Sequence, residues 1–242
     1  MTMKFKALIL AGGYGTRLKP ITDETPKCLV PIRGKPLLGY WLEHLASIGC
    51  RSVLINKHYL SYKVDEYLST INFPEMNIST VFEKNLLGTA GTLSENIDFF
   101  NNTKGLLMHA DNICSCNLNG LLKAHEKRKK GTILTMLTFQ TKEPSKCGIV
   151  KKDNSGVMTG FYEKINNPPG YCANGAIYFF ESEFINWFKN NKQNSKDFSK
   201  EVLPSLIDRI QTWHTNLPFI DVGTPETLKS ANDLIDPFQV GY

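Results

Sequence analysis

Apolar and polar positions alternate along the first half of the chain in the rhythm of strands and helices. The apolar segment Ala7–Leu10 stops in glycines, as expected of a first buried strand that carries a loop to the end of a sheet. Apolar residues between Leu37 and Leu45 recur at helical spacing and predict an amphipathic helix. The other elements expected before residue 110 are strands over Val53–Ile55, Ile78–Phe82 and Gly105–Met108 and helices over Tyr62–Leu68 and from Gly88-Thr89 to about Ile97. This alternation predicts an α/β fold with a mostly parallel sheet and helices on both of its faces.

The second half of the chain has a different pattern. Two apolar segments, Ile149-Val150 and Val157–Tyr162, flank the turn-rich Asp153–Gly156 and predict a hairpin. A final helix is expected from Pro225 to Leu234-Ile235, because Thr224 before it is a good N-cap. The remaining elements are a helix that begins near Leu118, strands over Ile133–Phe139 and Ala176–Phe180, and two helix-like segments after residue 180. Since there is no internal repeat, linker or low-complexity tract, residues 1–242 are expected to form a single domain.

Composition and charge narrow the classes of partner. The net charge of +5 is modest for 242 residues, and the hydrophobic fraction of 41% is ordinary for a globular protein. The basic run Lys127–Lys130 has no interleaved aromatic residues and follows a helix-like stretch, where cations complement the helix dipole. We therefore expect a solvated helix end there and no nucleic-acid partner. No apolar segment approaches the roughly 20 residues of a membrane span, so no membrane contact is expected either.

The six cysteines give an expectation about the redox state of the protein. None of them forms a Cys-x-x-Cys pair, and the one close pair, Cys114 and Cys116, has no His or Cys partner at zinc spacing. The sequence shows no secretory signal. We therefore expect reduced, structural thiols and a cytoplasmic location.

A glycine-rich loop edged with cations follows the first strand. Three glycines within four positions, Gly12, Gly13 and Gly15, let the backbone approach a ligand and direct its amides at an anion. Arg17 and Lys27 add fixed positive charge close by. The loop is not a Walker A loop, because no Gly-Lys-Ser/Thr follows it, and it lacks the third glycine of the dinucleotide fingerprint. The pattern indicates a polyphosphate ligand.

Residues 10–20, Leu-Ala-Gly-Gly-Tyr-Gly-Thr-Arg-Leu-Lys-Pro, followed by Pro26-Lys27 and Lys35-Pro36-Leu37, resemble the signature of the sugar-1-phosphate nucleotidyltransferases, the NDP-sugar pyrophosphorylases. Five further motifs follow in the order of that family, at Glu83–Thr92, Ala110–Ile113, Glu163-Lys164, Asn174-Gly175 and Phe219–Thr224. The resemblance implies a three-layer α/β/α, Rossmann-like nucleotidyltransferase fold with a mostly parallel, mixed central sheet. It also implies an enzyme of nucleotide-sugar and polysaccharide biosynthesis, which transfers a nucleoside monophosphate from a triphosphate to a sugar-1-phosphate and releases pyrophosphate.

The resemblance also implies roles for individual residues. Arg17, Lys27, Asp111 and Lys164 would be catalytic, because the reaction must bring two polyanions together. Mg²⁺ would be the cofactor, held by Asp111 and Asp221. The residues implied in nucleotide binding are Leu10, Ala11, Gly12, Gly13, Gly15, Thr16, Arg17, Glu83, Gly88 and Thr89. The residues implied in sugar-phosphate binding are Asp111, Glu163, Lys164, Asn174 and Gly175. Both substrates would be small molecules, and the resemblance leaves a homo-oligomer, dimer or tetramer, open.

The nucleobase and the sugar are less constrained. Glu83 stands at the position where the family reads the base, and a carboxylate, which only accepts hydrogen bonds, suits the adjacent N1–H and N2–H₂ donors of guanine. GTP is therefore favoured, with UTP or dTTP next and CTP last. The surrounding motif resembles the mannose- and heptose-1-phosphate guanylyltransferases, which favours mannose- or manno-heptose-1-phosphate as the second substrate.

Two other functions stay open at this point. One is cytidylyltransfer to a non-sugar phosphate such as phosphocholine, against which the Asn174-Gly175 step argues. The other is a catalytically silent, nucleotide-sensing subunit, against which the retained Arg17 and Lys27 argue. His109 stands where the family usually has glycine, and we expect it to be packed and to have no catalytic role. Only residues 236–242 follow the expected final helix, so the appended β-helix domain of some relatives is not expected.

Overall fold

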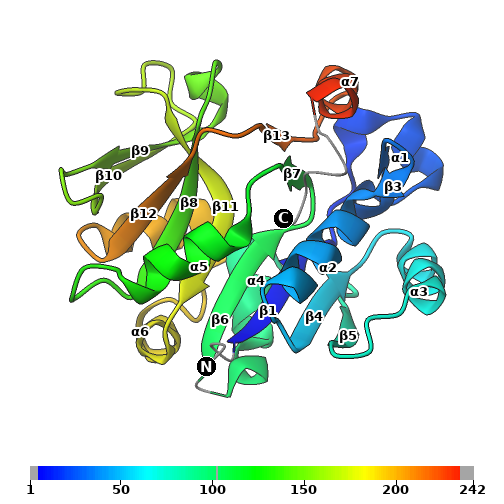
Figure 1. The fold of residues 1–242 in the computed structure, drawn as a ribbon, viewed down its shortest axis with the longest axis horizontal. Helices are drawn as coiled ribbons and strands as arrows, with labels where there is room; N and C mark the ends of the chain where they lie inside the picture. The colour runs from blue at the N-terminus through cyan, green and yellow to red at the C-terminus, as the bar shows by residue number, and fades with distance from the viewer. Residues whose placement is uncertain (1–4, 102, 235–242) are drawn as a thin grey trace. The chain divides into compact units, whose positions relative to one another are not determined.

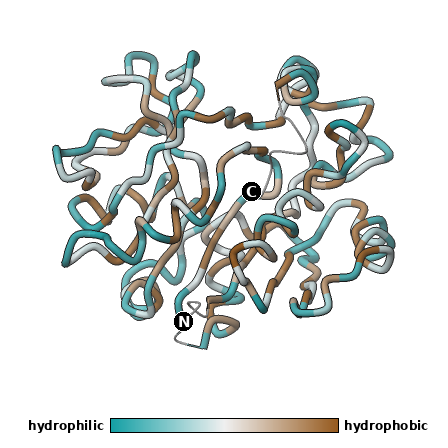
Figure 2. Tube along the Cα trace, viewed as in Figure 1, coloured by the Kyte–Doolittle hydropathy of each residue, from teal (hydrophilic) through white to brown (hydrophobic). Residues whose placement is uncertain are grey.

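The computed structural model describes residues 5–101 and 103–234, and contacts divide the chain into two compact units. Unit 1 holds the described residues in 5–86, 108–118 and 217–234, and unit 2 holds those in 87–107 and 119–216. In each unit the hydrophobic stretches lie mainly on strands and helices, and the hydrophilic stretches lie mainly on connecting loops (Figure 2). The expected organisation as one domain over residues 1–242 stays a prediction.

Unit 1 is built on parallel strands. β4 (Ser52–Lys57) lies between β1 (Phe5–Leu10) and β5 (Asn77–Phe82), and all three run in the same direction (Figure 1). Leu8 and Ile9 are neighbours on β1 and are both fully buried, as in a parallel strand that is covered on both faces. Because the strands are parallel, the loops that follow β1, β4 and β5 all leave the same edge of this sheet.

Helix α2 (Leu37–Ser47) is the helix expected between Leu37 and Leu45, and most of its side chains are buried. The indole Nε1 of Trp41 donates a 2.7 Å hydrogen bond to the main-chain oxygen of Asn112, which joins the helix to the segment after β6. The other short elements of unit 1 are η1 (Thr16–Leu18), α1 (Ile21–Glu24), η2 (Lys27–Leu29), β2 (Pro31–Ile32), β3 (Lys35–Pro36), α3 (Ser61–Thr70) and α7 (Pro225–Leu234).

A two-stranded antiparallel ribbon also belongs to unit 1. β7 (Asn112–Cys114) pairs with β13 (Phe219–Asp221), and Asp221 lies opposite Asn112. The ribbon shares a cluster of buried apolar side chains with the segment after the glycine loop, α2 and α7: Leu18, Val30, Ile32, Leu37, Tyr40, Ile113, Val222 and Ala231. Burial of this apolar surface holds the ribbon in place relative to the glycine loop.

Unit 2 contains a mixed set of strands. These strands are β8 (Leu134–Gln140), β9 (Gly148–Lys152), β10 (Met158–Glu163), β11 (Cys172–Phe180) and β12 (Ile210–Thr215). β11 pairs antiparallel with β8 and β9, β8 pairs in parallel with β12, and β9 and β10 form the expected hairpin. The helical elements are α4 (Thr89–Glu95), η3 (Ile97–Phe100), α5 (Leu118–Glu126), η4 (Pro144–Lys146), α6 (Ser182–Asn191), the π-helix η5 (Phe198–Val202) and η6 (Leu203–Leu206). Strand β6 (Lys104–His109) begins in unit 2, and its last two residues belong to unit 1.

The α/β fold class is confirmed, because the sheet is mixed and mostly parallel and helices flank it. Two helical regions follow β11 as expected, α6 and the pair η5–η6, but β12 was not expected. The N-cap of the final helix is confirmed, since Thr224 Oγ1 accepts a 3.3 Å hydrogen bond from the amide of Thr227. Ile235, which was expected to continue this helix, lies outside the described residues.

Lys127, Lys129 and Lys130 of the basic run after α5 are exposed, as expected of a solvated helix end, whereas Arg128 is half-buried. Arg128 Nη1 lies 3.0 Å from Oε1 of Glu181, and the same oxygen lies 3.2 Å from Nε2 of the buried His125. Lys104 is 3.3 Å from that carboxylate. One member of the run therefore belongs to a charge network inside unit 2, because a carboxylate that is only 15% exposed needs cationic and hydrogen-bonding partners.

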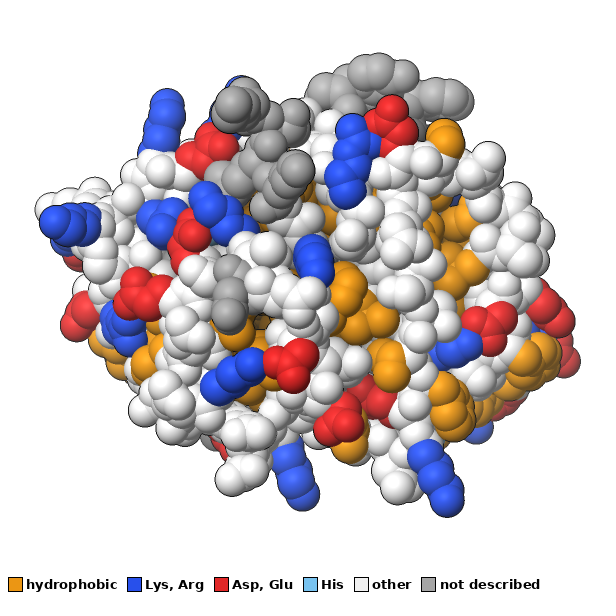
Figure 3. Space-filling model, turned by 90° about the horizontal axis from the view of Figure 1, so that it is seen from below, with side chains coloured by type: hydrophobic (Ala, Val, Ile, Leu, Met, Phe, Trp, Pro, Cys, Tyr) orange, Lys and Arg blue, Asp and Glu red, His pale blue; other side chains and the backbone are white. Residues whose placement is uncertain are grey.

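The surface shown in Figure 3 carries interspersed basic and acidic side chains rather than a region of one sign. Within residues 5–101 and 103–234, no helix has both the length and the apolarity that crossing a bilayer requires. The absence of nucleic-acid and membrane partners stays a prediction.

Candidate active site

The loop after β1 presents main-chain amides at the edge of the unit 1 sheet. The amide of Ala11 donates a 2.7 Å hydrogen bond to Oδ1 of the buried Asn56, which ties the loop to the end of β4. A Cβ on Gly12 would lie 2.9 Å from Nδ2 of the same side chain, so a side chain does not fit there. Among the described residues, none accepts a hydrogen bond from the amides of Gly12 and Gly13. Two free amides on a glycine loop are suited to an anionic ligand.

The far side of the loop is fixed by Gly15. Its φ of +66° lies in the left-handed region that favours glycine, and its carbonyl accepts a 2.8 Å hydrogen bond from Thr22 Oγ1. The chain then enters η1, which begins with Thr16 and carries Arg17. The residues expected to bind nucleotide, Leu10, Ala11 and the glycines, therefore lead directly along the chain to the Arg17 guanidinium.

Lys27 lies between two carboxylates. Its Nζ donates a 2.5 Å hydrogen bond to Oδ2 of Asp111 and lies 3.6 Å from Oδ1 of Asp221. Asp111 comes directly before β7 and Asp221 ends β13, so the ribbon holds the two carboxylates side by side. The amide of Val222 donates a 2.9 Å hydrogen bond to the main-chain oxygen of Asp111 and extends this pairing. The structure thus brings together the two residues that were expected to share a metal.

Arg17 borders one of these carboxylates, Asp221. A Cβ on Gly223 would lie 2.9 Å from Nη2 of Arg17 and 3.4 Å from Oδ1 of Asp221. Glycine at this position leaves the space that the guanidinium occupies. Arg17, Lys27 and the two aspartates therefore form one charge cluster in unit 1.

The charges of the cluster act on the pKa values of both carboxyls. Burial alone would raise the pKa of Asp111, but the Lys27 ammonium, together with His109, outweighs burial and lowers that pKa. Desolvation raises the pKa of Asp221, and the negative charge of Asp111 raises it further. Because the two carboxylates still repel each other in the presence of Lys27, the site favours additional positive charge.

The donor set fits a divalent cation that prefers oxygen ligands. Mg²⁺ is commonly held by one or two carboxylates together with substrate phosphates and water, rather than by a closed cage of side chains. Asp111 and Asp221 supply two such carboxylates, and within the part of the chain that the structure describes no group of three or more His, Cys, Asp or Glu side chains forms a closed site. His109 borders the pair, with Nδ1 3.9 Å from Oδ1 of Asp111.

The cysteines of the ribbon differ from the sequence expectation. Cys114 and Cys116 are joined by a disulfide, whereas reduced thiols were expected for all six cysteines. The chain turns directly after β7, which brings the two Cα atoms to 5.3 Å from each other. Cys28 and Cys50 are free and buried, as expected of structural thiols.

The residues implied in sugar-phosphate binding, apart from Asp111, lie in unit 2. Glu163 ends β10 opposite Gly148, and the next residue of β9, Ile149, lies opposite Ala173 of β11. This register brings Glu163 and Asn174 to the same end of the three strands β10, β9 and β11. Unit 2 therefore groups these two polar side chains as the sequence motifs suggested.

Local contacts orient the side chains of this group. Lys164 Nζ lies 3.5 Å from Oε1 of Glu163, and the backbone of Lys164 has a φ of +52°. Nδ2 of Asn174 donates a 2.7 Å hydrogen bond to the hydroxyl of buried Tyr178, and its Oδ1 accepts a 2.9 Å bond from the amide of Ala176. The register of β11 against β8 shifts between Asn174 and Tyr178, and Ala176 within this stretch has a φ of +52°, so the step Asn174-Gly175 begins an irregular part of the strand.

The residues implied in reading the base are divided between the units. Glu83 follows β5 in unit 1 and is only 5% exposed. Gly88 and Thr89 begin α4 in unit 2, where Thr89 Oγ1 accepts a 2.8 Å hydrogen bond from the amide of Phe198. The φ of +78° at Gly88 and a carbonyl that would collide with any Cβ there both require glycine.

Two residues of the unit 1 edge were missed by sequence reasoning. Asn56 supports the glycine loop, and His58 contacts both Tyr14 and Glu83. Both are polar residues at the carboxyl end of the buried strand β4. A polar residue at the end of a buried strand also marked Asp111 after β6. The sequence therefore contained the pattern that would have identified these two residues.

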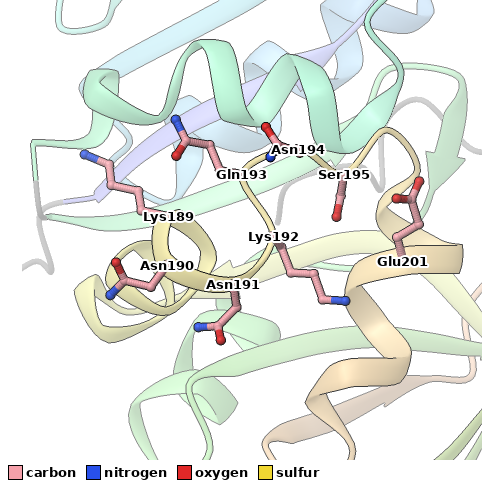
Figure 4. Close-up of a pocket in the computed structure, with 8 residues that line it drawn as sticks. All are labelled: Lys189, Asn190, Asn191, Lys192, Gln193, Asn194, Ser195 and Glu201. Atoms are coloured by element: carbon pink, nitrogen blue, oxygen red, sulfur yellow. The ribbon is translucent and has the colours of Figure 1, made fainter.

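Unit 2 also contains a surface cavity of about 430 Å³ at the end of α6 (Figure 4). Its lining residues are Lys189, Asn190, Asn191, Lys192, Gln193, Asn194, Ser195 and Glu201. None of the residues expected in the active site lines it.

Comparison with known proteins identifies the family. A family profile described as "Nucleotidyl transferase" matches residues 6–236. This chain belongs to that family. Its members generally use a divalent metal, and a nucleoside triphosphate and a sugar-1-phosphate are the family's substrates.

Individual relatives agree with this membership. The chain is 31% identical over 228 residues to the mannose-1-phosphate guanylyltransferase catalytic subunit beta of Drosophila pseudoobscura pseudoobscura, a match that covers 91% of this chain and 60% of the relative. It is 29% identical over 236 residues to the UTP–glucose-1-phosphate uridylyltransferase of a Synechocystis strain, with 90% and 60% covered. The chain thus spans about three fifths of the length of these curated relatives.

A solved structure of this nucleotidyl transferase fold comes from Yersinia pseudotuberculosis. HddC in complex with GMP-PN aligns with a TM-score of 0.76 at 23% identity, and the alignment covers 94% of this chain and 98% of HddC. At this level of identity the likeness supports the fold.

Proposed function

We propose that this nucleotidyl transferase moves a nucleoside monophosphate from a nucleoside triphosphate, with GTP favoured, to a sugar-1-phosphate and releases pyrophosphate. The observation that carries the proposal is the unit 1 charge cluster, in which Lys27 lies between Asp111 and Asp221 and Arg17 borders Asp221. A glycine loop with free amides precedes it. Cations next to free amides suit a triphosphate, and a carboxylate pair suits the metal that accompanies one.

The reaction is an in-line displacement at phosphorus. An oxygen of the sugar phosphate, already anionic near neutral pH, forms a bond to the α-phosphorus while the bond from that phosphorus to pyrophosphate breaks. No general base is needed. The amides of Gly12 and Gly13 and the guanidinium of Arg17 hold oxygens of the triphosphate. Lys27, kept in place by Asp111, stabilises the negative charge that develops around the α-phosphate.

Asp111 and Asp221 are the residues that would hold Mg²⁺. When bound there, the ion supplies positive charge to the phosphate oxygens of the reacting groups. The raised pKa of Asp221 beside Asp111 supports this assignment, since a cation relieves the repulsion between the two carboxylates.

The unit 2 group is assigned to the second substrate. Lys164 neutralises the phosphate of the sugar-1-phosphate, and Glu163 and Asn174 accept or donate hydrogen bonds to sugar hydroxyls. Gly175, in the stretch of β11 where the register shifts, lets the sugar ring approach the backbone. Gly88 and Thr89, also in unit 2, are assigned to nucleotide binding from their sequence motif.

GTP and a manno-configured sugar phosphate are the favoured substrates. Glu83 offers only acceptors to the base, as guanine's adjacent donors require, and the Drosophila relative is named a mannose-1-phosphate guanylyltransferase. HddC, whose fold is shared, is solved with GMP-PN. The Synechocystis relative is named a uridylyltransferase, so UTP is the second candidate.

The test is pyrophosphate release in the presence of Mg²⁺, with GTP, UTP, dTTP and CTP crossed against mannose-, manno-heptose-, glucose- and glucosamine-1-phosphate. Release with GTP and a manno-configured phosphate supports the full proposal. Release with another nucleotide retains the reaction and removes the base assignment. Triphosphate binding without release in any combination would favour a nucleotide-sensing subunit, and phosphocholine with CTP serves as the additional acceptor control.

A further inference from the structure

His58 occupies a central place at the unit 1 sheet edge. It follows β4, the strand between β1 and β5, in a register that pairs Leu10 with Asn56 and Lys57 with Phe82. The loop after β1 carries the free amides, and the segment after β5 begins with Glu83. His58 therefore lies between the two segments assigned to the phosphates and to the base.

Both ring nitrogens of His58 have a partner on one of these segments. Nδ1 lies 2.7 Å from the main-chain oxygen of Glu83, and Nε2 lies 2.9 Å from the hydroxyl of Tyr14. A carbonyl oxygen only accepts, so Nδ1 carries the proton. In that tautomer Nε2 accepts from the tyrosine hydroxyl. The Tyr14 and His58 rings also meet edge to face, with centroids 5.1 Å apart.

The packing around Gly12 places the glycine loop directly against His58 and the segment after β5. A Cβ there would lie 3.4 Å from Cβ of His58 and 3.5 Å from Cδ2 of Leu86, in addition to the contact with Asn56. The glycine loop is thus in contact with both the end of β4 and the segment that follows Glu83. A change at His58 alters how these two segments are held relative to each other.

We infer that His58 is a positioning residue for the nucleoside triphosphate: it links the phosphate loop, residues 11–15, to the base segment, residues 83–86, through its bonds to Tyr14 and Glu83. The inference rests on the proposed function, because it takes the two segments as parts of one nucleotide site. His58 sets their separation, so it governs binding of a ligand that spans both of them. A ligand that contacts the phosphate loop alone does not depend on this link.

Substitutions at His58 separate its two bonds. H58N keeps a donor near the Nδ1 position and loses the acceptor for Tyr14, and Y14F removes the same bond from the other side. H58Q keeps an acceptor near the Nε2 position and loses the bond to Glu83. Y62F is the matched control for Y14F, because Tyr62 is an exposed tyrosine on α3. His58 and Tyr14 both reach the surface edge of the unit, so these variants are expected to fold.

The experiment is isothermal titration calorimetry of GTP and of inorganic tripolyphosphate, with steady-state kinetics alongside. We expect H58N and Y14F each to raise the Kd for GTP by about 3- to 10-fold, and the double variant to bind no more weakly than the weaker single variant. H58Q is expected to weaken GTP binding through the other bond. The Kd for tripolyphosphate and the KM for the sugar phosphate are expected to stay within about two-fold of the wild-type values.

The outcomes separate the inference from the proposed function. If the wild-type protein binds neither GTP nor another nucleoside triphosphate, the proposed function fails. If the wild-type protein binds GTP but H58N and Y14F act additively, or if tripolyphosphate binding weakens as much as GTP binding, the positioning role is overturned. Equal effects of Y62F and Y14F would also overturn it.

Discussion

The ammonium of Lys27 donates a 2.5 Å hydrogen bond to Asp111 while it lies 3.6 Å from Asp221, so two carboxylates share one cation. Lys27 is only 8% exposed, and the main-chain pairing of β7 with β13 fixes the backbones that carry both carboxylates. The two aspartates therefore stay neighbours in the fold when the cation is removed. This relationship makes the charge balance of the site directly testable.

Replacement of Lys27 by Met leaves two neighbouring carboxylates without their shared cation. We expect turnover to fall by about 100-fold or more and the free energy of unfolding to fall by about 1–3 kcal/mol. Because Mg²⁺ relieves the repulsion that remains, the variant should gain more thermal stability from added Mg²⁺ than the wild type does. Differential scanning calorimetry with and without Mg²⁺ measures this, and equal gains in the two proteins would remove Lys27 from the charge balance.

Gly223 is expected to act through Arg17. In Gly223→Ala the added methyl group meets the guanidinium at 2.9 Å and displaces it, so kcat/KM should fall while the fold is retained. Arg17→Ala should lower turnover by about 100-fold or more. The double variant should have the same kcat/KM as Arg17→Ala alone. A further fall in kcat/KM in the double variant would show that Gly223 does not act through Arg17.

Asp111→Asn weakens the carboxylate pair and is expected to raise the Mg²⁺ concentration for half-maximal activity by about 10-fold or more. The control is Asp65→Asn, which removes a surface carboxylate whose partner is Lys57. A metal titration that is the same in Asp111→Asn and in the wild type would exclude Asp111 as a ligand.

Glu83→Gln replaces one of the two acceptor oxygens of the buried carboxylate by a donor. Guanine presents two adjacent donors, so the ratio of kcat/KM for GTP to that for UTP should fall by about 10-fold. The exposed Glu95 provides the control Glu95→Gln. Unchanged selectivity in Glu83→Gln would mean that the base is read elsewhere.

The charge network of unit 2 predicts how stability depends on pH. Bonding to His125, with Arg128 and Lys104 near, lowers the pKa of Glu181 from 4.5 to about 2. A carboxyl with a lowered folded pKa stabilises the protein above its unfolded pKa, and this contribution disappears as pH falls from about 4.5 to about 2. Glu181→Gln should lower the free energy of unfolding by about 1 kcal/mol at pH 7. The difference in this free energy between the variant and the wild type should shrink as the pH falls from about 4.5 to about 2. Urea unfolding at several pH values checks this, and a difference that is constant across the window would contradict it.

Much of the fold could be predicted because apolar residues recur along the chain at the spacing of strands and helices. The parallel strands β1, β4 and β5 and the helix α2 lie where apolar runs and helical spacing placed them. β12 was missed although Ile210 and Thr212 are buried at alternate positions. The strand mixes polar and aromatic residues and contains no continuous apolar run. The short strands of the β7–β13 ribbon carry no period long enough to detect.

The charge cluster could be predicted as a set of residue types but not as a geometry. Arg17 and Lys27 follow the glycine loop closely, so local sequence placed them together. The pairing of Asp111 with Asp221 depends on the register of two three-residue strands far apart in the chain, which residue spacing does not encode. The disulfide of Cys114 with Cys116 was missed for a related reason, because it depends on the turn that follows β7.

The discontinuous path of unit 1 has a consequence for biosynthesis. During translation Lys27 and Asp111 emerge early, and about a hundred further residues of unit 2 must be made before β13 appears and pairs with β7. Until then the nascent chain has one carboxylate beside Lys27, and Gly223 has not yet reached Arg17. The charge cluster is therefore among the last parts of the protein to mature, and a chain interrupted before residue 219 would leave the ribosome without it.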